Sequence, residues 1–178
     1  QHTARIAELT QSASQLPQIQ PEPVEWSRVR AQRIGSAVHA VLERHAKRAP
    51  LADAAAFART RFSLSESEFT ETLELAQVAA ASPIFTHELP SAHRVFTELP
   101  ISESHDDEST SRFVDLVFQN AQGNWIVVDY KTDDITLAQL PDVIEKKYRM
   151  QLTNYAKLLE RLTGAPPLET RLFFLRLN

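Results

Sequence analysis

Apolar residues follow a helical period in the first half of the chain. They recur three and four positions apart over 27–48, which predicts a long amphipathic helix with Ser27 as its N-cap. Two shorter helices are predicted over 52–61 and 66–81. Ser65 stands three residues before Glu68, the spacing of a capping box for the last of these helices.

The pattern changes to strands in the second half. Strands are predicted over 93–102, 111–119 and 124–131, and the segment NAQGN between the last two is typical of a hairpin turn. A helix over 142–162 and a strand over 169–177 follow. The order of helices, three strands, a helix and a strand predicts an α/β fold with a mixed central β-sheet flanked by helices.

The N-terminal segment differs from the rest in composition. Residues 1–26 are rich in Gln, Ser and Pro, so we expect an N-terminal arm or linker before a single domain at 27–178. A chain of 178 residues is long enough for one domain with a substantial core. Because the first residue is Gln1, we expect the chain to be a fragment of a longer protein.

Two acids and a lysine come together in the predicted hairpin. Asp115 and Asp129 are equidistant from Gln122 at the centre of the turn, so a regular hairpin places them opposite each other. Lys131 would lie on the same face, because side chains alternate along a strand. Opposed carboxylates repel, so one acid is protonated, or Lys131 pairs with an acid, or a divalent cation binds. Alternatively, a bulge breaks the pairing and an acid simply ends its strand near solvent.

A cation at this hairpin would have a defined chemistry. Mg²⁺ binds a few carboxylates and keeps water and phosphate oxygens in its remaining positions. The ion lowers the pKa of a bound water and stabilises charge on a phosphoryl group, and a neighbouring lysine can orient that water. The hairpin therefore favours hydrolysis of phosphodiester bonds.

Composition and charge narrow the alternatives. The absence of cysteine excludes disulfides, iron–sulfur clusters and cysteine nucleophiles, and three glycines cannot form a phosphate-binding ATP loop. We expect a cytoplasmic protein, because no apolar run or signal-peptide pattern is present. Net charge is −4, yet residues 28–61 hold eight Lys and Arg against two acids. This stretch can guide DNA, or it can be a set of solvated helix faces.

Four segments together resemble the PD-(D/E)XK nucleases of the RecB and AddA type. They occur in the order of that family as GSAVHAVLE, FVDLVF, WIVVDYK and YRMQLTNYAKLL. The resemblance implies a restriction-endonuclease-like core and a Mg²⁺-dependent nuclease, with Mn²⁺ as a substitute, that acts as an exonuclease on single-stranded DNA. It also implies an ATP-dependent helicase–nuclease in double-strand-break repair and recombination. Helicase domains of the same parent chain and a second, AddB-like or RecC-like subunit would be its partners.

The resemblance also implies roles for individual residues. The implied metal ligands are His39, Asp115, Asp129 and the backbone carbonyl of Tyr130. Lys131 would be the catalytic lysine, and Gln151 and Tyr155 would contact DNA or support the site. Gly35 and Glu98 would have supporting roles.

Each of these roles has a plainer alternative. His39 lies on a largely apolar helix face and can be a core histidine. Gln151 and Tyr155 can serve helix packing, and Glu98 can be a charge at a strand edge. The alternative function is a catalytically silent module that keeps the nuclease fold and binds DNA or a helicase partner.

Overall fold

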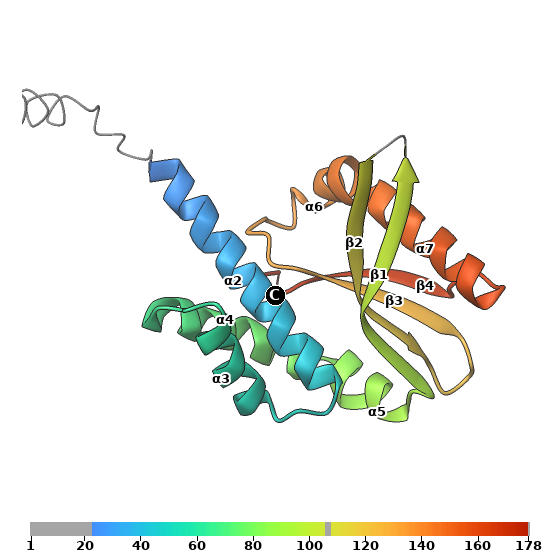
Figure 1. The fold of residues 1–178 in the computed structure, drawn as a ribbon, viewed down its shortest axis with the longest axis horizontal. Helices are drawn as coiled ribbons and strands as arrows, with labels where there is room; N and C mark the ends of the chain where they lie inside the picture. Colours follow the sequence, from blue (N-terminus) through green and yellow to red (C-terminus); the bar gives the residue numbers. More distant parts are fainter. Residues whose placement is uncertain (1–22, 106–107, 178) are drawn as a thin grey trace, which may run out of the picture. The chain divides into compact units, whose positions relative to one another are not determined.

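The structure is a computed structural model that describes residues 23–105 and 108–177 (Figure 1). The chain divides into two compact units, Gln1–Ala31 and Gln32–Asn178. Of the first unit, the described part is the start of a helix that continues into the second. The predicted arm at 1–26 therefore lies mostly outside the described residues.

Helices make up the first half of the described chain, as predicted. They are α2 (Pro23–Ala46), α3 (Leu51–Arg61), α4 (Glu66–Ala80), the π-helical turn η1 (Ile84–Glu88) and the short α5 (Leu89–Ser91). The predicted start at Ser27 is wrong, because α2 begins at Pro23, a residue whose fixed φ suits the first helical position. The elements η1 and α5 were not predicted, because they are too short to show a period in the sequence.

The predicted capping box at the start of α4 is confirmed. The Ser65 hydroxyl accepts a hydrogen bond from the Glu68 backbone N–H at 3.4 Å, and the Glu68 carboxylate accepts one from the Ser65 N–H at 2.9 Å. Glu68 also pairs with Arg33 of α2 at 3.0 Å. One carboxylate thus begins α4 and fastens it to α2.

The remaining elements form the sheet and the helices that cross over it. They are β1 (Arg94–His105), β2 (Glu108–Gln119), β3 (Trp125–Lys131), α6 (Leu140–Val143), the π-helical turn η2 (Ile144–Tyr148), α7 (Arg149–Thr163) and β4 (Glu169–Phe174). The strand order is β1-β2-β3-β4, with β1, β2 and β3 antiparallel and β4 parallel to β3. The predicted mixed sheet flanked by helices is confirmed.

Helices cover both faces of the sheet (Figure 1). On one face, Leu116, Phe118 and Val128 pack in the larger core with residues of α2, α3 and α4. On the other face, Val117 and Val127 pack with residues of α7. Because strand side chains alternate, β2 and β3 contribute to both cores, which explains the continuous buried apolar runs at 116–118 and 126–128.

The predicted helix over 142–162 is present as three consecutive pieces. Its first part is α6, its middle is the wider turn η2, and its last part is α7, which ends at Thr163 and is followed by Gly164. Gly164 has φ +78°, the left-handed conformation of a helix C-cap, as predicted. Wider turns of the η2 kind occur frequently at functional sites, and η2 ends directly beside the site described below.

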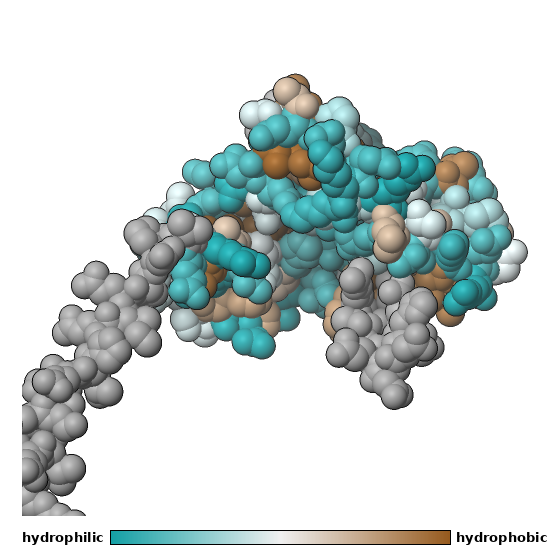
Figure 2. Space-filling view, turned by 90° about the horizontal axis from the view of Figure 1, so that it is seen from above, coloured by the Kyte–Doolittle hydropathy of each residue, from teal (hydrophilic) through white to brown (hydrophobic). Residues whose placement is uncertain are grey.

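The surface is mainly hydrophilic. On the face in Figure 2, hydrophobic residues form small separate patches among polar ones. Basic residues of the second unit pair with acids, in the pairs Arg33–Glu68, Lys47–Glu43 and Arg59–Glu66. Within the described residues, no helix has the length and apolar character needed to cross a membrane.

Candidate metal centre

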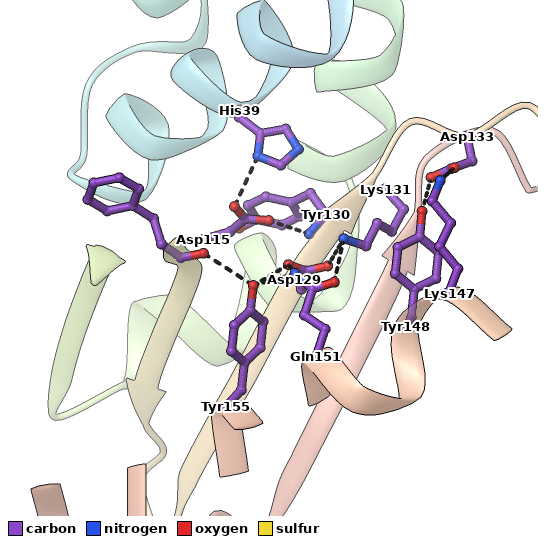
Figure 3. A network of polar contacts seen from close by, with 11 residues as sticks. His39, Asp115, Asp129, Tyr130, Lys131, Asp133, Lys147, Tyr148, Gln151 and Tyr155 are labelled. Carbon is purple, nitrogen blue, oxygen red and sulfur yellow. Dashed lines mark hydrogen bonds and ion pairs between the residues drawn. The ribbon is translucent and has the colours of Figure 1, made fainter. Parts of the chain in front are cut away.

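Five elements bring residues to one end of the β2–β3 ladder, and Figure 3 shows the polar contacts among those of α2, β2, β3 and α7. The helix α2 carries Gly35 and His39, and α7 carries Gln151 and Tyr155. The strands contribute Glu98 from β1, Asp115 from β2, and Asp129, Tyr130 and Lys131 from β3. The structure therefore brings all the residues singled out in the sequence into one region.

The hairpin has the predicted register but stops one pair early. Its last pair is Leu116 with Val128, so Asp115 and Asp129 follow the ladder instead of belonging to it. In place of a ladder bond, the Asp115 Oδ2 accepts a hydrogen bond from the backbone N–H of Tyr130 at 2.7 Å. The prediction of a regular cross-strand pair is wrong in this detail.

The side-chain alternation of β2 slips at the same place. Val114 and Val117 both pack in the α7-side core, although they are three residues apart. On the neighbouring strand, the pairs on either side leave Glu98 opposite Asp115, and Glu98 has φ +51°. A left-handed backbone is uncommon for a residue other than glycine and occurs often at functional sites. The backbone is thus reshaped where the acids meet.

Asp115 faces α2 and joins a group of possible metal ligands. Its Oδ1 lies 3.0 Å from the Nδ1 of His39, whose ring packs edge-on against Tyr130 at a centroid distance of 6.0 Å. One ligand atom each from His39, Glu98 and Asp115 lies within 4.8 Å of the others. His39 and Glu98 also line a cavity of about 370 Å³, so a ligand has room to approach.

Gly35 allows α2 to approach the end of β3 closely. A Cβ at this position would lie 3.0 Å from the hydroxyl oxygen of Thr132, which is tighter than ordinary contact. Gly35 precedes His39 by about one helical turn. The close approach of α2 to the strand end is therefore compatible with the contact between the His39 imidazole and Asp115.

Asp129 is the most deeply buried acid of the site, with 2% of its surface exposed. Its Oδ2 forms an ion pair with Lys131 but has no aligned hydrogen bond among the described residues. Its Oδ1 accepts hydrogen bonds at 3.2 Å from the Gln151 amide and from the Tyr155 hydroxyl. Gln151 also accepts one from the Lys131 ammonium at 3.2 Å. One amide therefore bridges the acid and the lysine.

The site contains more negative charge than it neutralises. Burial and the charge of Asp115 raise the pKa of Asp129, against the opposing effect of Lys131. Burial and Asp115 also raise the pKa of Glu98. Burial lowers the pKa of His39, but the hydrogen bond and charge of Asp115 outweigh it, so the His39 pKa is raised. Three groups thus bind protons more tightly than usual, as expected where a positive charge is lacking.

A divalent cation fits this set of donors. Carboxylate oxygens are the ligands that hard divalent ions prefer, and imidazole nitrogen is a common additional ligand. Asp115 and Glu98 offer oxygens beside the His39 nitrogen. A cation at this place would also relieve the repulsion that raises the pKa values of Glu98 and Asp129.

The raised pKa values predict how a metal ion and pH act together. The unfolded reference values are about 6.5 for histidine and about 4 for carboxyl groups. Since folding raises the pKa values of His39, Glu98 and Asp129, their contribution to stability is complete below those values and is lost as pH rises through the folded pKa values. A cation must displace these protons, so we expect Mg²⁺ to raise the melting temperature more at about pH 8 than at about pH 5.5.

Thermal unfolding at both pH values, with and without Mg²⁺, measures this effect. Calcium-free and magnesium-free buffers serve as the reference at each pH. A shift that is equal at both pH values, or larger in acid, would contradict the proton competition.

Sequence reasoning missed one aromatic contact of the site. The Lys131 ammonium lies 4.3 Å from the centre of the Tyr148 ring, and Tyr148 also donates a hydrogen bond to Asp133. The available signal was spacing, because Tyr148 precedes Gln151 by three residues and therefore shares its helix face.

Fold and site together define a class of protein: an α/β domain with a mixed sheet and a carboxylate-rich candidate metal centre. A sequence comparison identifies the family within this class, since the model of the PD-(D/E)XK nuclease superfamily matches residues 10–178. The chain belongs to the PD-(D/E)XK nuclease superfamily. No curated protein matches the chain. Nucleases of this superfamily use divalent metals, so metal-dependent nuclease activity and DNA binding are the functional class that membership supports.

Proposed function

We propose that this chain is a divalent-metal-dependent nuclease domain that hydrolyses phosphodiester bonds in DNA. The observation that carries the proposal is the convergence of His39, Glu98 and Asp115 within 4.8 Å beside the buried Asp129–Lys131 pair. Structural ion pairs alone do not account for it, because burial and the charge of Asp115 together raise the pKa values of both Glu98 and Asp129.

The proposed metal-binding groups come from the helix α2 and from the strands beside it. His39, Asp115 and Asp129 would hold the ion, together with the backbone carbonyl of Tyr130, and Glu98 would support them. The geometry favours a larger part for Glu98 than a strand-edge charge, because its carboxylate belongs to the close group with His39 and Asp115. When bound, the ion supplies a water of lowered pKa and stabilises charge on the phosphoryl group.

Lys131 is proposed as the catalytic lysine. An ammonium has three donors and no acceptor, and here Asp129 and Gln151 already orient it. A cationic group fixed beside the candidate metal centre stabilises the negative charge that develops on phosphate oxygens. Because it is held in place before the reaction, this stabilisation requires little reorganisation.

Gln151 and Tyr155 are proposed to keep Asp129 and Lys131 in a fixed relation. Burial and the charge of Asp129 raise the pKa of Tyr155, so its hydroxyl remains a donor throughout the neutral range. The Gln151 amide donates to Asp129 and accepts from Lys131. A carboxylate at position 151 could not donate to Asp129. We propose that Gln151 and Tyr155 support the site through these hydrogen bonds, whether or not they also contact DNA.

The finer proposal is a RecB- or AddA-type nuclease, part of a helicase–nuclease that repairs double-strand breaks. The four segments named above support it, because the histidine on α2 and the Gln–Tyr pair on α7 both reach the site. Mg²⁺ is the proposed ion, with Mn²⁺ as a substitute, and single-stranded DNA is the proposed substrate. Helicase domains of a parent chain and a second subunit are the proposed partners.

Incubation with defined DNA substrates tests the proposed function. We expect the purified chain to degrade linear single-stranded DNA with Mg²⁺ or Mn²⁺, and EDTA to stop the reaction. An exonuclease leaves circular single-stranded DNA intact, whereas an endonuclease cuts it. Undiminished cleavage in EDTA would contradict the metal requirement. A folded protein that binds DNA but cleaves none of these substrates would favour the catalytically silent module.

A further inference from the structure

The Lys131 ammonium contacts three different groups. The lysine side chain is only 13% exposed. Its ammonium faces the Asp129 carboxylate, the Gln151 amide oxygen at 3.2 Å and the ring of Tyr148 at 4.3 Å from the centroid. The last distance is well within the range of a cation–π contact. The carboxylate and the amide are already part of the proposed site, whereas the Tyr148 ring is not.

The Tyr148 ring is itself held from several directions (Figure 3). Its hydroxyl donates a hydrogen bond to the Asp133 Oδ2 at 2.7 Å, and its ring packs edge-on against Phe174 at 6.0 Å between centroids. The Lys147 ammonium lies 4.9 Å from the ring centre and pairs with Asp133. Only 5% of Tyr148 is exposed. The ring is therefore a fixed surface rather than a mobile one.

The helix geometry aligns this ring with the other α7 contacts. Tyr148 is the last residue of η2, and Gln151 and Tyr155 follow it in α7 at spacings of three and four. Residues so spaced share one helix face. Tyr148 thus extends the Gln151–Tyr155 face by one turn toward Lys131.

A metal ion would affect the attraction of these three groups for the Lys131 ammonium differently. A divalent ion that takes Asp129 oxygen withdraws the carboxylate from Lys131 and repels the ammonium. The attraction between an ammonium and an aromatic face does not depend on that carboxylate. Burial, together with the hydrogen bond and charge of Asp133, raises the pKa of Tyr148 to about 12 despite the opposing Lys147. The ring therefore stays a neutral phenol, whose hydroxyl continues to donate to Asp133.

We propose that Tyr148 is a positioning residue that keeps the Lys131 ammonium at the site when a metal ion engages Asp129. The proposal rests on the proposed function for the role of Lys131. It concerns the ring face, and the hydroxyl matters only as a tether to Asp133. Loss of the ring and loss of the hydroxyl alone should therefore have different effects.

Kinetics of two variants test this difference. In Tyr148→Leu the ring is lost, and we expect kcat for DNA cleavage to fall about 10-fold, the size of a desolvated cation–π contact, with KM and Mg²⁺ affinity unchanged. In Tyr148→Phe the ring remains, and we expect kcat within about 3-fold of the parent protein, since only the tether is lost. Equal losses in both variants, or an unchanged kcat in Tyr148→Leu, would overturn the proposal.

A spectroscopic measurement tests the same contact without relying on cleavage. Lysines carrying ¹³C-methyl groups remain cationic, and a methylated Lys131 over the ring should give an upfield-shifted signal, assigned with Lys131→Arg and distinguished from that of Lys147 with Lys147→Arg. We expect this signal to stay upfield when Mg²⁺ is added, to persist in Tyr148→Phe and to move downfield in Tyr148→Leu. A signal in the parent protein that moves to the unshifted position on adding Mg²⁺ would overturn the proposal, even if Tyr148→Leu does not fold. An upfield signal in a protein that cleaves no DNA would refute the proposed function but not the contact between Lys131 and the Tyr148 ring.

Discussion

Lys131→Ala is expected to lower the rate of DNA cleavage by about 100- to 1,000-fold, because it removes a fixed positive charge from the place where negative charge develops. The loss should appear in kcat, since Lys131 is not among the proposed metal ligands. Asp129 should still bind the ion, and Mg²⁺ affinity measured by calorimetry should not fall.

The same substitution has a predictable effect on stability. Asp129 is almost fully buried, and Lys131 is its charged partner. Removing one partner of a buried pair costs on the order of 3 kcal/mol because the other charge is left uncompensated. A bound divalent ion replaces that missing charge, so the loss of stability should be smaller with Mg²⁺ than without it.

Lys157→Ala is the matched control for both effects. Lys157 lies exposed on the same helix that carries Gln151, so its removal changes the net charge equally without touching the site. We expect near-parental cleavage and stability for this control. Lys131→Ala protein that is folded and cleaves DNA at the parental rate would exclude Lys131 as the catalytic lysine.

Asp115→Asn is expected to weaken Mg²⁺ binding by at least about 100-fold and to abolish cleavage with it, since the variant loses a charged ligand at the centre of the group. The asparagine has nearly the same shape and can still accept the hydrogen bond from the Tyr130 N–H. The effect therefore reports the charge of Asp115 rather than the packing around it.

Without metal, Asp115→Asn should make the protein more stable near neutral pH. The charge of Asp115 contributes to the raised pKa values of Glu98 and Asp129, so its removal relieves repulsion between buried carboxylates. A gain in melting temperature together with a loss of metal binding is the pattern of a site that sacrifices stability for function.

Calorimetry measures the Mg²⁺ affinity of Asp115→Asn, and thermal unfolding in EDTA measures its stability without metal. Asp142→Asn is the control, because Asp142 is an exposed acid of α6 that pairs with Lys146 and lies outside the hairpin. Unchanged Mg²⁺ affinity in Asp115→Asn would show that Asp115 is not a ligand. A lower melting temperature in EDTA would show that its charge stabilises the metal-free fold.

The sequence predicted the fold well because its local signals agree with the tertiary structure. The capping box at Ser65 and the C-cap at Gly164 each depend on a few neighbouring residues, and both are present. The hairpin register followed from a turn centred at Gln122 and from apolar strands buried on both faces. Such signals do not depend on distant parts of the chain, which explains why the sequence reveals them.

The sequence predicted which of these residues lie together, but not the details of their geometry. Equal spacing placed Asp115 and Asp129 together, yet the early end of the ladder depends on a hydrogen bond from the Tyr130 backbone that no periodicity encodes. The left-handed backbone at Glu98 is likewise a response to the neighbouring strand. The wider turn η2, which carries Tyr148, was not predicted, and the spacing of Tyr148 from Gln151 indicates a shared helix face but not the contact with Lys131. Departures from regular geometry thus concentrate where the charged groups meet.

A crystal of the protein soaked in Mn²⁺ would show whether these residues bind a metal ion, because anomalous scattering locates the ion independently of activity. We expect a single strong peak within about 2.5 Å of a carboxylate oxygen of Asp115, with the His39 imidazole and Asp129 in its coordination shell and Lys131 next to it but unbound. Mn²⁺ found only on exposed acids, with His39 and Asp115 still hydrogen-bonded to each other, would contradict this expectation.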